Sequence, residues 1–134
     1  MKYIEYRVNS KIKPEELNSI IELVGWKGRS REEWLKILEL SSFHVSAWSG
    51  SHLVGFGRIF EDGVMCMIYD VMVDPNFQNR KIGTTIMKHI MEELRNHNFH
   101  TTGLFAWNKK PELRKFYKKF GFIEVSHGMQ LKDK

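Results

Sequence analysis

Apolar and polar residues follow distinct rhythms along the first forty residues of the chain. Residues 2–8 alternate one by one, which is the pattern of a half-buried strand. Residues 17–24 repeat apolar side chains three and four positions apart, shortly after Pro14, which suits the first turn of a helix. Ser30 and Glu33 have the spacing of a capping box and open a second helix. This part of the chain is predicted to be a strand followed by two helices.

The rest of the chain predicts a run of strands and then alternating helices and strands. Residues 43–60 contain two alternating segments around a Ser-Gly-Ser turn, and residues 64–73 are apolar on both faces, like a central strand that is covered on both sides. Later elements are expected as a long helix from Ile82, a strand over 101–106, a helix over 111–120 and one or two strands over 122–131. Such an order predicts a mixed α/β fold, with a mostly antiparallel central sheet and about four helices on its two faces.

Composition and charge narrow the class of protein. We expect one domain over residues 1–134, and the lone cysteine, Cys66, excludes an internal disulfide and fits a cytoplasmic protein. No apolar run has the length of a membrane span, and the N-terminal residues do not resemble a signal peptide. The net charge of +5 suits an anionic partner, which can be a nucleic acid, a membrane surface or a phosphate-bearing cofactor. No zinc finger, recognition helix or aromatic–basic platform favours nucleic acid, so neither nucleic acid nor a membrane is expected as partner.

A polar loop between the central strand and the long helix has the features of an anion site. Residues 74–81 lead from Asp-Pro into the helix N-terminus, where the first amides lack partners within the helix and the helix dipole is positive. Arg80 and Lys81 add positive charge, Gly83 leaves room for a phosphate, and Thr84 offers a hydroxyl. These signals taken alone fit a solvated basic turn equally well.

The sequence Gln78-Asn79-Arg80-Lys81-Ile82-Gly83 resembles the pyrophosphate loop of the GNAT superfamily, Gln/Arg-x-x-Gly-x-Gly/Ala. The preceding residues 71–75 and the following Thr84 fit the same pattern. The resemblance implies that residues 78–84 bind acetyl-CoA. Lys81 stands where the family usually has its first glycine, so we expect the loop to pass this residue with a normal φ.

A second match lies near the C-terminus. Phe116-Tyr117-Lys118-Lys119-Phe120-Gly121-Phe122 is similar to the family signature Phe-Tyr-x-x-x-Gly-Phe. The resemblance implies that the Tyr117 hydroxyl lies near the coenzyme sulfur, where a neutral phenol can protonate the departing thiolate. A core residue on the inner face of an amphipathic helix is the alternative interpretation of Tyr117.

The same resemblance assigns further coenzyme contacts. Asn108 matches a family asparagine that contacts the pantetheine arm or the coenzyme tail. In the family the strands corresponding to 64–73 and 101–106 diverge, which implies backbone contacts to pantetheine from Val71, Met72 and Val73. Arg114 either reaches the adenosine 3′-phosphate or belongs to an exposed salt bridge. The basic residues Arg80, Lys81, Lys109, Lys110, Arg114 and Lys118 are expected to flank the coenzyme channel.

Asp70 is the one charged residue within the apolar stretch 64–73. Burial raises the pKa of a carboxyl group toward the range of a general base, and an ammonium acceptor must lose a proton before it attacks. Asp70 is therefore predicted to act as the base, or else only to stabilise the sheet through hydrogen bonds. His127 is a weaker candidate base. Cys66 has no partner base, which favours direct transfer in a ternary complex over a covalent intermediate.

The acceptor side is expected to be aromatic. In the family the corresponding segments wall the acceptor pocket, which implies roles for Trp26, Arg29, Trp34, Tyr69 and Trp107, although packing explains each aromatic residue equally well. Val24-Gly25-Trp26, residues 69–75 and Gly128-Met129 look most like the small single-domain branch that contains plant serotonin N-acetyltransferases and many uncharacterised bacterial relatives. This branch implies a small amine acceptor, with arylalkyl amines among the candidates.

These observations predict an N-acetyltransferase that moves the acetyl group of acetyl-CoA to a primary amine of a small molecule. No cluster of His, Cys, Asp or Glu has metal-site spacing, so no metal is expected. Two alternatives stay open, a non-catalytic coenzyme A sensor and a relative that acetylates protein lysines or N-termini. A homodimer is also left open.

Overall fold

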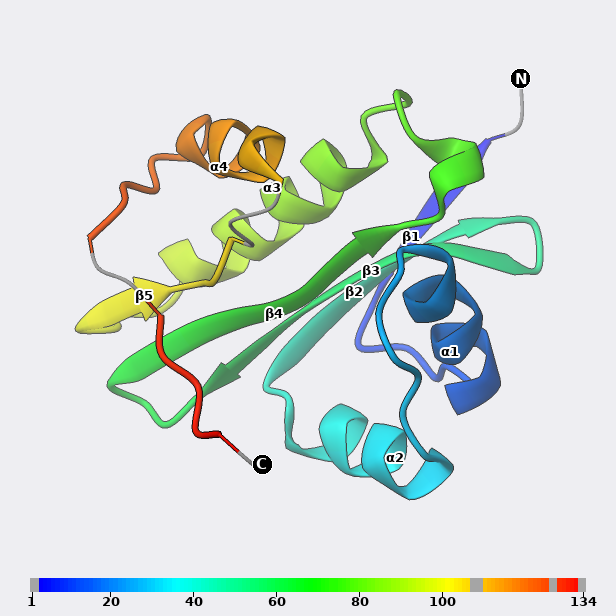
Figure 1. Cartoon of the computed structure of the whole chain (residues 1–134), viewed down its shortest axis with the longest axis horizontal. Helices are drawn as coiled ribbons and strands as arrows, with labels where there is room; N and C mark the ends of the chain where they lie inside the picture. The colour runs from blue at the N-terminus through cyan, green and yellow to red at the C-terminus, as the bar shows by residue number, and fades with distance from the viewer. Residues whose placement is uncertain (1–2, 107–109, 126–127, 133–134) are drawn as a thin grey trace.

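The computed structural model describes residues 3–106, 110–125 and 128–132 of the chain. Its elements follow one another as β1 (Ile4–Val8), α1 (Pro14–Leu23), α2 (Arg31–Leu40), β2 (Phe43–Ser49), β3 (His52–Glu61), β4 (Met65–Val73), the 3₁₀ turn η1 (Pro75–Phe77), α3 (Ile82–Arg95), β5 (Thr101–Gly103) and α4 (Pro111–Lys118). Figure 1 shows their arrangement. The predicted order of strand, two helices, hairpin, central strand and long helix is confirmed.

The strands form one sheet in the order β1-β2-β3-β4-β5. The first four pair antiparallel with their neighbours, and β5 pairs with β4 in parallel. The parallel pair follows from α3, which carries the chain back along the sheet between β4 and β5. The predicted mostly antiparallel sheet is confirmed, and β4 lies inside the sheet as expected.

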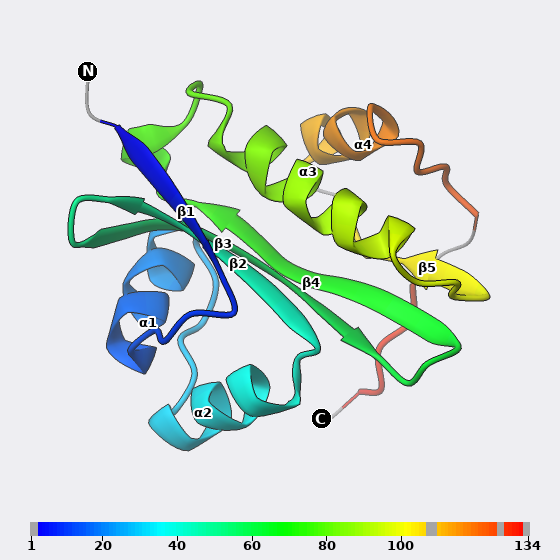
Figure 2. The ribbon, with the colours of Figure 1, turned by 180° about the vertical axis from the view of Figure 1, so that it is seen from behind.

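Helices cover both faces of the sheet, as the sequence predicted. Figures 1 and 2 show α1 and α2 on one face and α3 with α4 on the other. Each helical layer has its own core. Trp34 and Phe56 belong to the core under α1 and α2, and Ile86 and Ile90 belong to the core under α3. The capping box is also confirmed, since the Ser30 side chain accepts from the Glu33 amide at 3.1 Å.

Two glycines allow α3 to lie close to β3. A Cβ atom on Gly55 would lie 2.9 Å from Cδ1 of Ile86, and one on Gly57 would lie 2.8 Å from Cγ2 of the same residue. Both distances are below any ordinary carbon contact, so a larger residue would force the Ile86 side chain or the helix to shift. This close approach fixes the position of α3 and therefore of its N-terminus.

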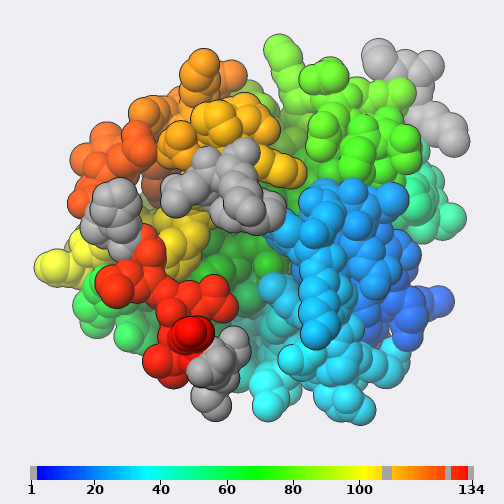
Figure 3. Space-filling model, viewed as in Figure 1, coloured from blue at the N-terminus to red at the C-terminus, as the bar shows by residue number. Residues whose placement is uncertain are grey.

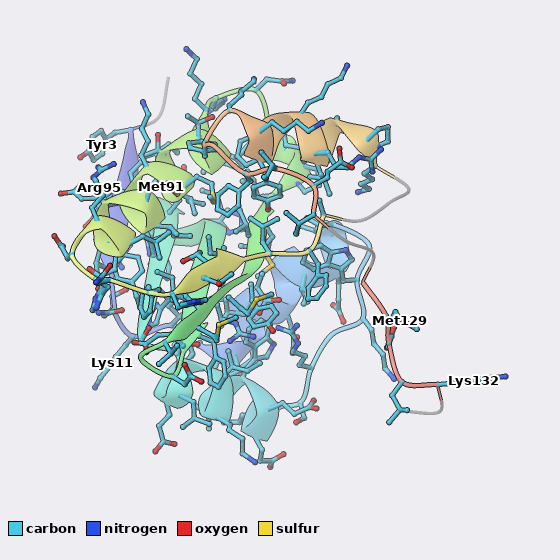
Figure 4. All side chains as sticks on the ribbon, turned by 90° about the vertical axis from the view of Figure 1, so that its left-hand side faces the viewer. Tyr3, Lys11, Met91, Arg95, Met129 and Lys132 are labelled. Atoms are coloured by element: carbon cyan, nitrogen blue, oxygen red, sulfur yellow. The ribbon has the colours of Figure 1, made fainter. Side chains whose placement is uncertain are left out.

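The C-terminal part departs from the prediction. The strand expected over 101–106 is only three residues long, and the strands expected over 122–131 are wrong for the described residues of that range. Ile123 and Val125 are 78% and 81% exposed, and Figure 4 shows Met129 outside the body of the protein. The apolar alternation is present, but β5 is too short to offer an edge along which a further strand could pair.

Candidate active site

A cavity opens where β4 and β5 diverge. The two strands pair only at Met65, Cys66 and Met67, opposite Thr101, Thr102 and Gly103. Beyond these pairs the chain of β4 continues to Val73 while β5 has ended. The space between them is a cavity of about 820 Å³. The predicted divergence of these strands is therefore confirmed, and it exposes the edge of β4 inside the molecule.

Five segments wall the cavity, and one of them is the pair Leu104 and Phe105 directly after β5. Its floor is residues 68–73 of β4, and its far side is the start of α3 with the loop before it. Helix α4 contributes a third wall, and the end of α1 with the segment after it contributes the fourth, at residues 23–26. Figure 3 shows atoms of β4 in green between the C-terminal segment in red and the α1–α2 part in blue.

Most of the residues predicted from the sequence meet in this cavity. The predicted residues that line it are Trp26, Tyr69, Asp70, Val71, Met72, Val73, Gln78, Asn79, Lys81, Ile82, Gly83, Thr84 and Tyr117. Arg29, Arg80 and Arg114 are not among the lining residues. Trp107, Asn108, Lys109 and His127 lie outside the described residues.

The loop before α3 has an unusual backbone. Lys81 is the N-cap residue of α3 and has φ 61° and ψ 24°, the left-handed conformation. The expectation of a normal φ at Lys81 was wrong. The family glycine would adopt this conformation without strain, and Lys81 adopts it in spite of its side chain. Asn79, with φ 67°, does the same two residues earlier, so two residues of this loop have the backbone conformation that glycine adopts most easily.

Replacing Lys81 with glycine should therefore stabilise the protein. We expect the free energy of unfolding to rise by about 1 kcal/mol, because glycine enters the left-handed region without a steric cost. Thermal and urea unfolding of the purified variant measure this. The matched control is Arg80→Gly, since Arg80 is not among the residues with positive φ. A control that is stabilised as much as Lys81→Gly would contradict the explanation.

The helix start beyond Lys81 is open to the cavity. The first amides of a helix lack intrahelical acceptors, and Ile82, Gly83 and Thr84 all line the cavity. A Cβ atom on Gly83 would lie 3.5 Å from Cζ of Phe116 and 3.6 Å from Cγ2 of Val73, which are ordinary contacts. The protein itself therefore does not require glycine here. Because Gly83 has no side chain, the N-terminus of α3 stays uncovered.

The basic residues around the cavity divide into two groups. Lys81 and Lys110 line it. Arg114 instead lies 3.4 Å from the Glu124 carboxylate, and Lys118 lies 3.0 Å from the same group. The exposed salt bridge, which was one of the two interpretations of Arg114, is the one observed. The Arg80 guanidinium lies 5.2 Å from the ring centroid of Phe77.

Tyr117 lies on α4 with its side chain between the core and the cavity. It is 8% exposed, lines the cavity and belongs to the α3-side core. Phe116 and Phe122 contact its ring edge-on, with centroids 5.1 Å and 6.2 Å away. Burial raises the pKa of Tyr117 to about 12. The phenol is therefore a neutral hydrogen-bond donor throughout the physiological range.

Asp70 is the extra residue of a β-bulge. Arg58 pairs with Tyr69 and Phe56 pairs with Met72, so Gly57 faces two residues of β4. Asp70 has φ 56°, in the left-handed region that aspartate tolerates better than most residues. The bulge shifts the in-and-out alternation of the β4 side chains by one residue, so even-numbered residues before it and odd-numbered residues after it face the same side of the sheet. Ile68 before it and Val71 after it both pack into the α3-side core, which explains why this strand reads as apolar on both faces.

Two arginines hold the Asp70 carboxylate. Arg29 donates from Nη1 to Oδ2 at 2.8 Å and from Nη2 to Oδ1 at 3.0 Å, and Arg58 donates from Nε to Oδ2 at 2.7 Å. Burial alone raises the pKa of Asp70, but the hydrogen bonds and charges of Arg29 and Arg58 outweigh it and lower the pKa. The expected upward shift was wrong because the sequence did not show these two partners. A carboxylate held in this way is a weak proton acceptor.

Arg58 is the site residue that the sequence analysis missed. Its side chain is 12% exposed, and its guanidinium lies 4.9 Å from the ring centroid of Tyr69. An arginine within an otherwise apolar strand was a feature of the sequence that could have identified Arg58 as a site residue. The hairpin register, which sets Arg58 opposite Tyr69 and one residue from Asp70, would have connected the two.

The acceptor end of the cavity combines aromatic and charged groups. Trp26 and Tyr69 line the cavity. Trp34 does not, because it is fully buried and its indole donates to Oδ1 of Asn18 at 2.7 Å. Arg29 lies behind Asp70, with its guanidinium 4.6 Å from the ring centroid of Trp34. The aromatic wall expected from the sequence is therefore formed by Trp26 and Tyr69 among the described residues.

Within residues 3–106, 110–125 and 128–132, no three His, Cys, Asp or Glu side chains are grouped so that they could hold a metal ion. In the same part of the chain, no helix has the length and apolar character needed to cross a membrane.

Comparisons with known proteins identify a family. The profile of the Acetyltransferase (GNAT) family matches residues 12–122. The uncharacterized N-acetyltransferase ycf52 of Pyropia yezoensis is 33% identical over 127 residues, which cover 91% of this chain and 71% of the relative. Serotonin N-acetyltransferase 2 of Oryza sativa subsp. japonica is 29% identical over 111 residues, which cover 79% of this chain and 54% of the relative.

Solved structures share the same fold. A Staphylococcus aureus protein of unknown function, described as a probable acetyltransferase, superposes with a TM-score of 0.87 at 27% identity and covers 97% of this chain and 99% of its own. A GNAT family acetyltransferase from Streptococcus pneumoniae superposes with a TM-score of 0.80, covering 98% of this chain and 100% of its own, and its 21% identity bears on the fold alone.

Proposed function

The chain belongs to the GNAT family of N-acetyltransferases, and we propose that it transfers the acetyl group of acetyl-CoA to the primary amine of a small molecule. One observation carries the proposal. The divergence of β4 and β5 opens one cavity that is lined both by the N-terminal residues of α3 and by Tyr117. An anion site can bind the phosphates of the thioester, and a neutral proton donor can assist the departure of its thiolate.

The coenzyme fits this cavity by its chemistry. The pyrophosphate would bind at residues 78–84, where helix amides and Lys81 offer hydrogen bonds and positive charge. The pantetheine arm would lie along Val71, Met72 and Val73, on the side of β4 that β5 leaves unpaired. A peptide-like arm pairs with a free strand edge as another strand would. Arg114 has no part in this proposal, since Glu124 engages it.

The reaction needs one bond made and one broken. The uncharged amine nitrogen attacks the thioester carbon, the new C–N bond forms, and the C–S bond breaks to release a thiolate. Tyr117 donates its phenolic proton to the sulfur, and the proton that the amine loses returns through water to the phenolate. Because the pKa of Tyr117 is raised to about 12, the phenol holds its proton until the thiolate forms.

Asp70 is not the proton acceptor in this proposal. Its pKa is lowered by Arg29 and Arg58 in spite of burial, so it remains a carboxylate and accepts hydrogen bonds from both arginines. Its role is to hold the two guanidinium groups beside the cavity. The acceptor therefore reacts as the free amine, with water taking the proton.

The pH dependence of stability tests this role of Asp70. A lowered folded-state pKa contributes stability that is fully present above the unfolded pKa and is lost as pH falls below it. We expect Asp70→Asn to lower the free energy of unfolding by roughly 3 kcal/mol at neutral pH, because it leaves the partly buried Arg29 and Arg58 without their shared counter-charge. Below about pH 4 the difference between parent and variant should shrink. Urea unfolding from acidic to neutral pH measures both effects.

The same variant distinguishes between two roles of Asp70, a general base in the reaction and a carboxylate that only supports the structure. If Asp70 only positions the arginines, the rise of kcat/KM with pH belongs to the amine and should persist in Asp70→Asn at a lower absolute rate. Loss of that rise in a variant that is still folded at the assay temperature would restore Asp70 as the general base.

Coenzyme titration and thiol release test the proposed function as a whole. Acetyl-CoA should bind in calorimetry, and free thiol should appear when small primary amines are added in a panel that also contains a lysine-bearing peptide. Binding without thiol release from any amine would favour a coenzyme sensor, and release with the peptide alone would favour protein acetylation. Either result would contradict the proposal.

We further propose a cytoplasmic, reducing location. The single buried thiol of Cys66 agrees with it, and burial raises the pKa of that thiol and so keeps it unreactive. Two relatives carry the word chloroplastic in their names, and a plastid stroma would be reducing in the same way.

A further inference from the structure

The turn between β2 and β3 lies beside the start of the loop that leads to α3, as Figures 1 and 2 show. We call residues 75–81 the coenzyme loop. Asp74 directly precedes it and is 2% exposed. Its amide donates to the Val54 carbonyl at 2.8 Å, and its Oδ1 accepts from the Asn76 amide at 2.9 Å. Asp74 therefore joins the beginning of the coenzyme loop to β3.

The Asp74 carboxylate needs a partner for its second oxygen. The side chain is 3% exposed, and a carboxylate at this depth is costly unless hydrogen bonds or an opposite charge replace the lost water. Its Oδ2 lies 3.4 Å from Nε2 of His52, the first residue of β3. Because an ionised carboxylate only accepts hydrogen bonds, this contact places the ring proton on Nε2. Within residues 3–106, 110–125 and 128–132, no other basic side chain lies within 4 Å of the Asp74 carboxylate.

His52 also contacts the coenzyme loop directly. Its ring packs against the ring of Phe77, with centroids 6.2 Å apart and the ring planes at 47°, which is within the range of aromatic pairs. Phe77 lines the cavity, and the Arg80 guanidinium lies 5.2 Å from the centroid of the same ring. His52 therefore contacts both the residue before the loop and a loop residue that forms part of the cavity wall.

The coenzyme loop depends on support from outside. Asn79 and Lys81 have φ values of 67° and 61°, a conformation that is unfavourable for residues with a side chain. Such a backbone persists only where the surrounding structure imposes it. The contacts of His52 at the beginning of the loop are part of that structure, and the loop ends at the N-terminus of α3, where the pyrophosphate is proposed to bind.

From these contacts we propose that His52 is a positioning residue for coenzyme binding. Through Asp74 and Phe77 it holds the coenzyme loop in the shape that leaves the N-terminus of α3 open to the phosphates. His52 is not among the residues that line the cavity, and it acts on the coenzyme only through the loop. The inference rests on the proposed function for the identity of the ligand. It adds to that function a residue of the β2–β3 hairpin, which no motif in the sequence indicated.

Two substitutions that differ in reach test the proposal. Glutamine carries its NH₂ group one bond further from the backbone than asparagine, so His52→Gln can still donate to Oδ2 of Asp74 and His52→Asn cannot. The His52 side chain is 59% exposed beside the turn at Gly50, so the fold tolerates either amide. Calorimetry should show that His52→Asn binds acetyl-CoA about tenfold more weakly than the parent, the scale of one hydrogen bond to a charged group. His52→Gln should stay within about threefold of the parent, because it loses only the ring contact.

The matched control is His97→Asn. His97 pairs with Glu93 in the same way, with Nε2 at 2.9 Å from Oε2, but neither residue is among those that line the cavity. Its acetyl-CoA affinity should stay parental. In all three variants kcat at saturating acetyl-CoA should stay within about twofold of the parent, while the KM for acetyl-CoA rises markedly in His52→Asn alone. A fall of kcat in His52→Asn as large as the loss of affinity would mean general damage and would overturn the positioning role.

Trypsin tests the loop without any ligand. Arg80 and Lys81 are its cleavage sites in the coenzyme loop, and a loop that opens more often is cut faster. Cleavage at these two sites should be several-fold faster in His52→Asn than in the parent, His52→Gln and His97→Asn, with similar unfolding temperatures. Equal cleavage, or faster cleavage without loss of affinity, would overturn the inference. A parent that binds no acetyl-CoA would count against the proposed function, and the cleavage rates would then decide whether His52 holds the loop.

Discussion

Replacing Tyr117 with phenylalanine should lower turnover by roughly 10²–10⁴-fold, the range expected when a general acid is lost. The change removes one hydroxyl and keeps the ring, with its edge-on contacts to Phe116 and Phe122. The free energy of unfolding should therefore change by only about 1 kcal/mol, the scale of one hydrogen bond. Acetyl-CoA affinity should stay within a few fold, because the phenol acts mainly as charge builds on sulfur. Steady-state turnover with any accepted amine, measured beside thermal unfolding and coenzyme titration, gives all three quantities.

The control for this experiment is Tyr6→Phe. Tyr6 lies on β1, stacks on His89 with centroids 5.6 Å apart, and is not among the residues that line the cavity. It loses the same hydroxyl at a distance from the chemistry, so turnover should remain parental. A folded Tyr117→Phe protein that binds acetyl-CoA and turns over like the parent would leave Tyr117 as a core residue only.

Gly83→Glu should reduce acetyl-CoA affinity by roughly 10²-fold. A carboxylate would then extend from the first turn of α3 into the cavity and oppose the coenzyme phosphates, and like charges about 4 Å apart at a partly solvated site repel by several kcal/mol at most. It would also occupy the space in front of the helix amides. Calorimetric titration of acetyl-CoA into parent and variant measures the loss, and higher salt should reduce it in part.

Gly83→Ala separates charge from shape. A Cβ atom at this position makes contacts of 3.5 Å and 3.6 Å with Phe116 and Val73, so the methyl group fits without displacing the core. The alanine variant should be as stable as the parent and should lose far less affinity than the glutamate variant. If alanine and glutamate weaken binding equally, bulk rather than charge is responsible. Unchanged affinity in Gly83→Glu would remove the phosphate site from this loop.

Much of the fold could be predicted because its signals are local. The capping box of Ser30 and Glu33, the turn at Gly50 and the start of α3 at Ile82 are written in a few neighbouring residues each, and the structure confirms all three. The prediction of strands over 122–131 was wrong because a strand depends on residues that are distant in the sequence. Ile123 and Val125 alternate as strand residues do, but a strand also needs a partner edge, and the length of β5 is not written in their own sequence.

Only part of the candidate site could be predicted from the sequence. Tyr117 and residues 78–84 were identified by motifs, which reflect a local backbone shape and a single reactive group, and all of them except Arg80 line one cavity. The backbone at Lys81 was misjudged because a side chain usually excludes the left-handed region, whereas here the surrounding loop imposes it.

The elements from β1 to α4, their order, the family and the loop that precedes α3 could be predicted from the sequence, because period, caps and motifs act over a few residues. The tertiary structure decided the chemistry of Asp70. Arg29 is 41 positions away in the chain and Arg58 is 12 away, and only the folding of the α1–α2 segment and the β3–β4 hairpin against each other brings both guanidinium groups to one carboxylate. A pKa depends on the balance between burial and neighbouring charges. Its direction at Asp70 could not be read until those neighbours were in place.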